Sequence, residues 1–186
     1  AEATASPDGT RIVFTSMRRG NPDLFIMNLK TRETKQITDS IQYEGGAFFS
    51  WDGKHIVYRA SVYTDAQMAE YKKNLANNIM RPGVFEIFVC DADGKNHRQI
   101  TNFGAASFAP AWHPSNQKII FTSNLQDPTS HNFELYMIDI NGRNLERITY
   151  NDWFDGFPMF SPDGKRLVFC SNRNPSNPSQ TNVYIA

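Results

Sequence analysis

The sequence predicts an all-β protein, a β-propeller built from four-stranded antiparallel blades. Two observations support this prediction. A turn of the form Ser-Pro-Asp-Gly, in exact or altered form, begins at residues 6, 50, 113 and 161, so the period is in the forties once an insertion in the second repeat is set aside. Short apolar segments flank every turn in the same order. Four short strands at such a period are typical of propeller blades, whereas a β-sandwich has no reason to repeat its turn residues at a fixed period.

Each repeat supplies the strands of one blade in chain order. A short apolar segment such as 46–49 precedes the turn and predicts the innermost strand. The second strand is expected at 11–16, 55–60, 118–123 and 166–171, and the third at 24–27, 87–90, 135–138 and 183–186. The outer strand is expected at 36–38, 99–101 and 147–149. The chain 1–186 is therefore one propeller domain with three complete blades, at about 1–38, 44–101 and 107–149, and a fourth at 155–186 that lacks its outer strand.

The turn residues explain why the chain reverses at each repeat. Proline fixes φ at the first central position, Asp hydrogen-bonds to nearby backbone, and Gly adopts positive φ. The third turn, His113 to Asn116, lacks both Asp and Gly. We expect this departure to change one turn and to leave the fold intact.

The insertion in the second blade, residues 61–83, predicts a helix over about 64–80. Thr64 and Gln67 have the spacing of a capping box. Apolar residues recur at three- and four-residue steps, at Met68, Tyr71, Leu75 and Ile79. Pro82 and Gly83 are expected to end the helix. The helix either packs over the rim of its own propeller or serves as a lid or partner-docking helix.

The composition excludes several classes of function. Nineteen basic residues balance nineteen acidic ones, so there is no electrostatic signature of nucleic-acid binding. No apolar run is long enough to span a bilayer. Cys90 and Cys170 are interpreted as apolar strand residues. The four histidines have no metal-ligand spacing, and the sequence has neither a nucleophile elbow nor a phosphate-binding glycine loop. We therefore predict no metal, no cofactor and no catalytic residue, although paired carboxylates across the channel stay open as an alternative.

The turn, the following Arg/Lys-Ile-Val-Phe-x-Ser strand, the Leu-Tyr/Phe-x-Met strand and the closing Gln/Arg-Ile-Thr together resemble TolB-type propeller repeats, over essentially the whole chain. Families of this kind often have about six blades, so the resemblance implies that the chain is the C-terminal portion of a longer protein. A four-blade ring and two chains that close one ring are the alternatives. The open edge of the fourth blade is a template for strand pairing.

The same resemblance suggests a function. Such repeats occur in periplasmic interaction proteins and in the gating domains of peptidases. The first hypothesis is a non-catalytic, extracytoplasmic, periplasmic-type scaffold that binds a protein or peptide. The alternative is the substrate-gating propeller of a larger hydrolase or peptidase, or a carbohydrate-active propeller.

The strand order places the candidate binding site. The long, variable loops 17–23, 61–83, 124–132, 150–155 and 172–182 lie on one face, here called the long-loop face, and variable loops on a rigid scaffold concentrate binding residues. Glu44 and Asp155 share one repeat position beside the channel mouth, where the third repeat has Ser107. The two acids either bind a cation or basic group, or cap backbone N–H groups. Further candidate binding residues are Tyr43, Trp153 and Phe154, which with Phe103 wedge between blades or form an exposed patch, and Tyr71 of the helix.

Overall fold

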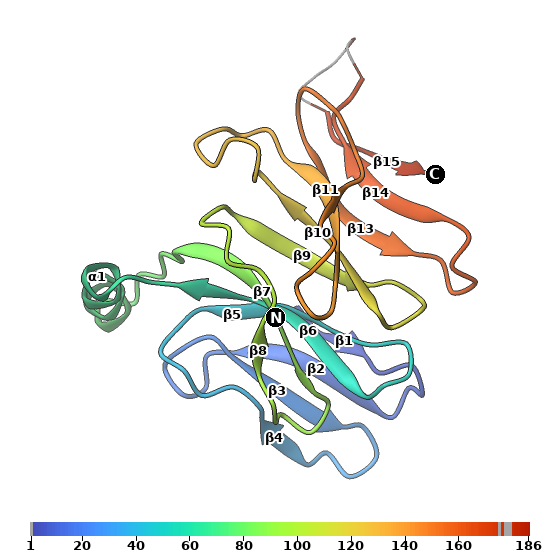
Figure 1. Ribbon diagram of the computed structural model, residues 1–186. Coiled ribbons are helices and arrows are strands. Elements are labelled where there is room, and N and C mark those ends of the chain that lie inside the picture. Colours follow the sequence, from blue (N-terminus) through green and yellow to red (C-terminus); the bar gives the residue numbers. More distant parts are fainter. Residues whose placement is uncertain (1, 175, 177–179) are drawn as a thin grey trace.

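The computed structural model describes residues 2–174, 176 and 180–186. Four sheets follow one another in chain order, and they are called blades 1 to 4 here (Figure 1). Blade 1 contains β1 (Thr4–Ala5), β2 (Arg11–Ser16), β3 (Asp23–Asn28) and β4 (Thr34–Gln36). Blade 2 contains β5 (Glu44–Phe49), β6 (His55–Val62), β7 (Val84–Asp91) and β8 (Arg98–Gln99). Blade 3 contains β9 (Ser107–Trp112), β10 (Lys118–Ser123), β11 (Glu134–Asp139) and β12 (Glu146–Arg147). Blade 4 contains β13 (Asp155–Phe160), β14 (Leu167–Ser171) and β15 (Asn182–Ile185).

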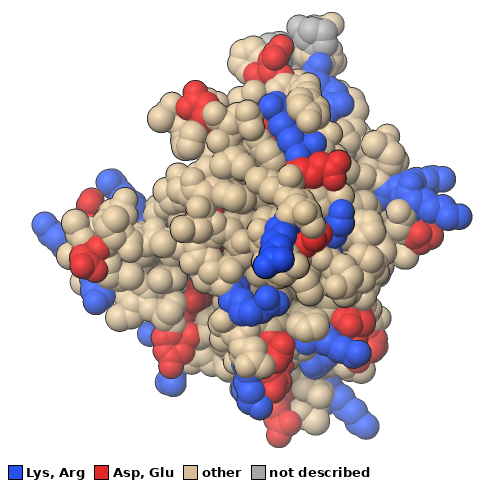
Figure 2. All heavy atoms as spheres, in the orientation of Figure 1, with Lys and Arg blue, Asp and Glu red and all other residues tan. Residues whose placement is uncertain are grey.

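The predicted fold class is confirmed. In every blade the strands pair in chain order and antiparallel, which is the meander expected for a propeller. Within the described residues, blade 4 has three strands, with β15 at its edge. The first strands of neighbouring blades contact one another, as β9 does with β5 and β13, so these strands form the inner edge. Basic and acidic side chains are interspersed over the face that Figure 2 shows, as expected from the balanced composition.

The apolar core lies between adjacent blades. Val13 and Leu24 of blade 1 pack in one cluster with Ile56 and Tyr58 of blade 2. A second cluster joins blades 2 and 3 and includes Trp112, whose Nε1 donates to the carbonyl oxygen of Phe48 at 3.0 Å. Burial of each large side chain contributes about 1.5–3 kcal/mol, so blade-to-blade packing is the main stabilising term.

The inner strands share a bulge at their third residue. Gly46, Ala109 and Phe157 occupy this position in β5, β9 and β13 and have φ of 61°, 49° and 56°. The strand register shifts at the same place in all three blades. A bulge re-aims the neighbouring side chains, so the residue that begins each inner strand faces the adjacent blade in a repeatable way. This bulge was not predicted from the sequence, because its position carries glycine in one repeat only.

The altered third turn keeps the geometry of the others. Asn116 takes the place of glycine with φ of 58°, a conformation that asparagine tolerates better than most residues. Its N–H donates to the carbonyl oxygen of His113, as the N–H of Gly53 does to Ser50. The fold is intact as expected, but the expected change in this turn does not occur, because Asn116 adopts the left-handed conformation that glycine has in the other turns.

The outer strands lie earlier in the chain than expected, because each ends at the Gln or Arg that begins the Gln/Arg-Ile-Thr motif. The isoleucine that follows turns into the core, and Ile37 and Ile100 are both buried. The threonine then accepts a hydrogen bond from the third strand, as Thr38 Oγ1 does from the Leu24 N–H at 2.8 Å. The motif therefore forms the end of the outer strand and the residues after it, which the buried isoleucine and the hydrogen-bonded threonine hold in place.

The helix α1 (Asp65–Ala76) lies between β6 and β7 and projects from the side of the molecule (Figure 1). The capping box of Thr64 and Gln67 is present as predicted. The helix ends at Ala76, with Asn77 as its C-cap, rather than near residue 80, because Asn78 adopts a left-handed conformation with φ of 58°. The Ile79 N–H then bonds to the Asn74 carbonyl oxygen, which completes a Schellman motif. Ile79 consequently lies outside the helix.

Candidate functional site

The strand-start residues occupy one structural position. Glu44, Ser107 and Asp155 begin β5, β9 and β13, and all three side chains are buried, with exposures of 4%, 0% and 0%. Glu44 and Asp155 each contact the loop that links their blade to the preceding one, whereas Ser107 contacts Ser123 of its own blade. The three residues occupy the same position in their blades but have different neighbours. The neighbours determine whether each side chain is paired, uncharged or without a cationic partner.

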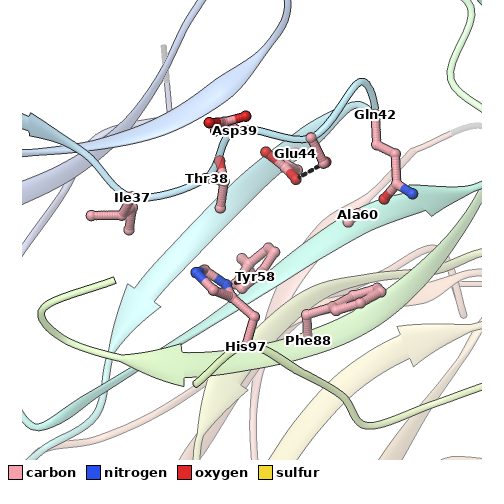
Figure 3. Close-up of a pocket in the computed structure, with 10 residues that line it drawn as sticks. Ile37, Thr38, Asp39, Gln42, Glu44, Tyr58, Ala60, Phe88 and His97 are labelled. Atoms are coloured by element: carbon pink, nitrogen blue, oxygen red, sulfur yellow. Dashed lines mark hydrogen bonds between the residues drawn. The ribbon is translucent and has the colours of Figure 1, made fainter. Parts of the chain in front are cut away.

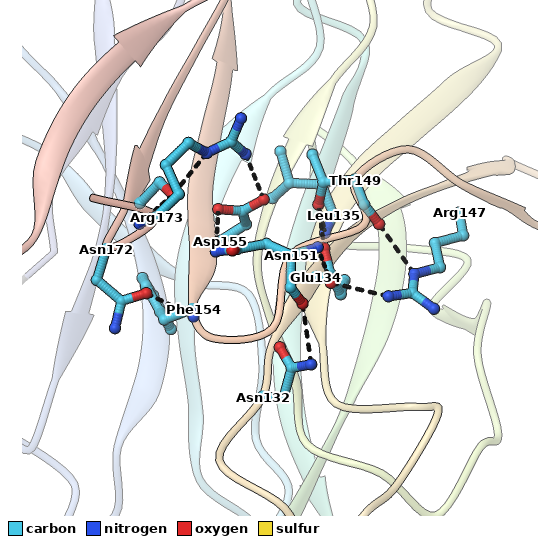
Figure 4. A network of polar contacts seen from close by, with 11 residues as sticks. Asn132, Glu134, Leu135, Arg147, Thr149, Asn151, Phe154, Asp155, Asn172 and Arg173 are labelled. Carbon is cyan, nitrogen blue, oxygen red and sulfur yellow. Dashed lines mark hydrogen bonds and ion pairs between the residues drawn. The ribbon is translucent and has the colours of Figure 1, made fainter. Parts of the chain in front are cut away.

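Asp155 is neutralised inside the protein. The Nη2 atom of Arg173 lies 2.6 Å from Asp155 Oδ2, and Asn151 donates to Oδ1 at 3.2 Å (Figure 4). Arg173 belongs to the loop that follows β14 in the same blade. A buried carboxylate with a cationic partner and a second donor is a satisfied structural group.

Ser107 has an uncharged environment. Its hydroxyl group lies 3.1 Å from that of Ser123. The ring of Phe103 stacks on Phe121 with 6.4 Å between ring centroids and fills the space between blades 2 and 3. Phe103 is therefore one of the wedging rings that the sequence predicted.

Glu44 is the acid without a cation. Ser40 Oγ donates to Glu44 Oε1 at 2.5 Å, whereas Oε2 is buried and has no hydrogen bond of normal geometry among the described residues. Burial raises the pKa of Glu44 to about 7, the nearby hydroxyl groups of Ser40 and Thr38 lower it in part, and the charges of Asp23 and Asp39 raise it further. The carboxyl group is therefore poised to change its charge near neutral pH.

A pocket of about 380 Å³ lies between blades 1 and 2, beside this carboxyl group, and is called the Glu44 pocket here. Its lining consists of Ile37, Thr38, Asp39, Ser40, Gln42, Glu44, Tyr58, Ala60, Phe88 and His97. Figure 3 shows loop 37–42 and Glu44 on one wall and Tyr58, Phe88 and His97 on the other. The volume is within the range of small-ligand sites. The equivalent space between blades 2 and 3 is filled by Phe103, where the Glu44 pocket has the small residue Ser40.

The aromatic wall of the pocket is held rigidly. The Tyr58 and Phe88 rings stack with 5.6 Å between centroids. His97 Nε2 lies 3.2 Å from the Gly94 carbonyl oxygen, which can only accept, so Nε2 carries the proton. His97 Nδ1 therefore accepts the hydrogen bond from Tyr58 Oη at 2.9 Å. Burial raises the pKa of Tyr58, which keeps this hydroxyl protonated as the donor.

A second set of acids was missed from the sequence. Glu134 begins β11, and its carboxylate accepts hydrogen bonds from Thr149 Oγ1, the Asn151 N–H and Arg147 at 2.5, 2.6 and 2.8 Å (Figure 4). Glu86, the third residue of β7, has the same role in blade 2 and accepts hydrogen bonds from Thr101 Oγ1 and two loop N–H groups. These carboxylates clamp the loops between blades. An acid directly before the third apolar strand recurs in the first three repeats, and that signal could have revealed the clamp.

Helix α1 is coupled to the wall of the Glu44 pocket. Tyr71 is 2% exposed, stacks on Tyr63, and donates from its hydroxyl to Asn21 Oδ1 at 2.9 Å. Asn21 Nδ2 in turn donates to the carbonyl oxygens of Ser40 and Gln42 at 2.9 and 2.5 Å. The buried Tyr71 thus acts on loop 37–42 from within the protein.

We expect Tyr71→Phe to lower the free energy of unfolding by about 1–2 kcal/mol, because it leaves the buried Asn21 Oδ1 without its donor. Urea unfolding followed by circular dichroism measures the change. Tyr150→Phe is the control, because Tyr150 is 77% exposed. Equal midpoints for the two variants would show that the helix is not anchored in this way.

The remaining aromatic candidates lie in two groups. The Tyr43 ring packs edge-on against Phe85, and Arg59 lies over both rings. Phe154 belongs to an aromatic patch between blades 3 and 4, in which neighbouring rings of Phe108, Phe133, Phe154 and Phe157 lie 5.3–6.1 Å apart. Trp153, the residue before Phe154 in the long loop 150–155, is 56% exposed. Phe157, in the inner strand β13, is 55% exposed.

The described residues contain no group of three His, Cys, Asp or Glu side chains arranged to hold a metal ion. No helix in the described part of the chain is long and apolar enough to cross a membrane. Part of the loop 172–182 lies outside the described residues.

Comparison with known proteins gives one consistent fold. A family model described as the TolB beta-propeller domain matches residues 73–184. The crystal structure of TolB from Acinetobacter baumannii is similar with a TM-score of 0.76 and 22% identity, and the match covers 98% of this chain and 39% of that one. A TolB structure from Agrobacterium tumefaciens gives 0.70 and 22%, covering 91% and 53%. The chain therefore spans about two fifths and about half of these two proteins.

Peptidases share the same architecture. The acylaminoacyl peptidase of Pyrococcus horikoshii has a TM-score of 0.64 and 16% identity, and the match covers 100% of this chain and 30% of that one. At such identities the likeness shows the fold alone, and one fold can carry several functions. The choice between an interaction role and a gating role therefore depends on the side chains of this chain.

Proposed function

This chain belongs to the TolB beta-propeller domain family, and on that premise we propose that it is a non-catalytic, extracytoplasmic module that binds a protein or peptide on its long-loop face. The observation that carries the proposal is the Glu44 pocket. It holds a buried carboxyl group with an unused oxygen, and loop 37–42, which links blades 1 and 2, forms one wall. An unsatisfied buried polar atom that faces an open pocket is the feature that a bound ligand would complete.

Three of the other buried acids support an interaction role rather than a catalytic one. Glu86, Glu134 and Asp155 are each occupied by hydrogen bonds or ion pairs from their own neighbours. Their geometry explains how the loops are held in place, and these acids are therefore assigned to the scaffold. A rigid scaffold with one incomplete pocket suits recognition.

The aromatic patch supplies the second part of the surface. Trp153 presents an exposed ring in a loop of the long-loop face, and Phe157 adds an exposed ring on the inner strand β13. Tryptophan and other aromatic side chains contribute a large share of binding energy at protein interfaces, because they bury much area with few rotatable bonds. The partner is therefore expected to cover this patch with apolar groups.

The edge of β15 is a separate contact region in this proposal. Its Val183 and Ile185 side chains are 69% and 68% exposed, and its pairing in the described residues is with β14 alone. An unpaired strand edge can accept a further strand by backbone hydrogen bonds. A partner segment in extended conformation would fit this edge.

We expect a photo-reactive amino acid at position 153 of the full-length protein to form one defined adduct in the native source. The same group at Thr31, in a turn on the opposite face, serves as the matched control. Once the partner is purified, Trp153→Ala should weaken its binding by about tenfold or more, as expected for an interface hot spot, and Thr31→Ala should not.

The fractions in which these adducts appear test the location. An adduct recovered from the extracytoplasmic fraction supports the proposal, and one that co-purifies with cytosolic markers contradicts it. Equal adduct formation at positions 153 and 31, or unchanged partner affinity of Trp153→Ala, would exclude the long-loop face as the docking surface.

A further inference from the structure

In blade 4 an arginine side chain occupies the space that corresponds to the Glu44 pocket of blade 2. The guanidinium carbon of Arg173 lies 4.9 Å and 5.2 Å from the ring centroids of Phe169 and Tyr184, which form a cross-strand pair. Its Nη2 pairs with Asp155, and its Nε donates to Ser171 Oγ at 2.9 Å. The site thus combines two stacked rings, a carboxylate and a hydroxyl group around one planar cation.

Blade 1 repeats the arrangement on its own aromatic pair. The guanidinium carbon of Arg18 lies 5.3 Å and 4.6 Å from the centroids of Phe14 and Phe25. Its Nε donates to Ser16 Oγ at 3.1 Å. Arg18 and Arg173 follow the end of the second strand of their blades at the same distance in sequence. An arginine over the aromatic pair is therefore a recurring structural feature of this chain.

Blade 2 has the aromatic pair and the acid of this arrangement but lacks the arginine. Tyr58 and Phe88 form the cross-strand aromatic pair, and Glu44 stands at the position of Asp155. Val62 occupies the position of Arg173, and Ala60 that of Ser171. Glu44, Tyr58, Ala60 and Phe88 all line the Glu44 pocket. The pocket is thus the space that the arginine side chain fills in blade 4.

Blade 3 shows that the pocket is not a general result of losing the arginine. Leu125 stands at the arginine position there, and Ser107 stands at the position of the acid. Phe103 and Leu125 pack against the apolar core between blades 2 and 3. Blade 3 has neither the arginine nor the acid, and side chains fill the equivalent space. Blade 2 lacks the arginine but has the acid, and the space beside the acid is open.

We propose that the Glu44 pocket binds the side chain of an arginine supplied by a partner protein or peptide. The guanidinium group lies over the Tyr58 and Phe88 rings, and it pairs with Glu44 Oε2, the oxygen that Ser40 leaves free. Arginine fits better than lysine, because a planar guanidinium group stacks on rings and hydrogen-bonds to a carboxylate at the same time. Asp39, on the same wall, adds negative charge. This inference rests on the proposed function for the class of partner.

The probe is a five-residue peptide, acetylated and amidated, with one central arginine between glycines. Its controls carry citrulline, which has the same shape without charge, or lysine. Titration of the isotopically labelled protein at pH 8, followed by amide chemical shifts, should show saturable changes at Ser40 and Ala60 with the arginine peptide. We expect the citrulline peptide and the Glu44→Gln variant each to bind about tenfold more weakly or worse, because the charge-assisted hydrogen bond is lost.

A second variant supplies the ligand from within the chain. Val62→Arg places an arginine at the position of Arg173, on the face of β6 that carries Tyr58 and Ala60. It should raise the melting temperature and abolish binding of the arginine peptide, whereas Val62→Gln should do neither. Equal binding of arginine and citrulline peptides, or full affinity in Glu44→Gln, would refute the arginine site. If adducts still form at position 153 while the arginine peptide does not bind, this inference fails and the proposed interaction function stands.

Discussion

Glu134→Ala is expected to lower the free energy of unfolding by about 3–5 kcal/mol, the loss typical of breaking a buried ion pair. Glu134 is 2% exposed and accepts hydrogen bonds from Arg147, Thr149 and Asn151. Its removal leaves these donors without their acceptor and releases the loop between blades 3 and 4. Urea unfolding of the variant, followed by tryptophan fluorescence, measures the effect.

The neighbouring strand supplies the control for this prediction. Glu146 is an exposed acid at the start of β12, and Glu146→Ala removes the same charge without breaking a buried contact. We expect it to change stability by less than about 0.5 kcal/mol, as surface substitutions usually do. A similar loss in both variants would mean that the clamp is not a major stabilising contact.

Glu44→Gln is expected to stabilise the free protein at pH 8 by up to about 3 kcal/mol, the value of a pKa that differs by two to three units between the folded and unfolded states. The pKa of Glu44 rises from 4.5 to about 7 on folding, chiefly because the carboxyl group is buried. The folded protein therefore binds more protons than the unfolded chain between these values. The stabilising contribution is fully present below pH 4.5 and is lost as the pH rises through about 7. Glutamine stays neutral throughout and avoids the loss.

The measurement compares unfolding free energies of wild type and Glu44→Gln from pH 4.5 to pH 8. The difference between the two proteins is the informative quantity, because other acids, such as Asp23 with its raised pKa, titrate in both. Glu33→Gln, at an exposed turn residue, should leave the pH profile unchanged. A constant difference between wild type and Glu44→Gln across this range would show that the buried carboxyl group does not titrate there.

The two predictions separate two uses of buried acids in one repeat protein. The carboxylate of Glu134 accepts hydrogen bonds from three residues, so the folded structure depends on it. Glu44 has one strong donor and no cationic partner among the described residues, so burial disfavours its ionised form in the free protein. A site that sacrifices stability in the free state and gains it on binding is the pattern expected of a recognition residue.

Much of the architecture could be predicted from the sequence, because it depends on local residue patterns. The recurring Ser-Pro-Asp-Gly turn requires a fixed backbone geometry, and it sets where each second strand begins. The capping box at Thr64 likewise fixed the start of α1. The end of that helix was misplaced, because Asn78 stops it through a left-handed conformation that asparagine adopts in some contexts only.

The candidate site could be predicted in part. Glu44 and Asp155 were found from their shared repeat position, and both begin an inner strand. The sequence did not show that Arg173 neutralises Asp155 while Glu44 stays without a cation. It also did not indicate that Tyr71 is buried against Asn21.

The sequence by itself determined the blades, their order and the repeat positions that face the adjacent blade, because turn residues and strand patterns act over a few neighbouring residues. Only the tertiary structure decided which of those positions became a pocket. That outcome depends on contacts between blades: Phe103 fills the gap between blades 2 and 3, and Ser40 leaves the equivalent gap open. Packing across a blade interface joins residues far apart in the chain, and side-chain volume and charge at both walls decide the result together.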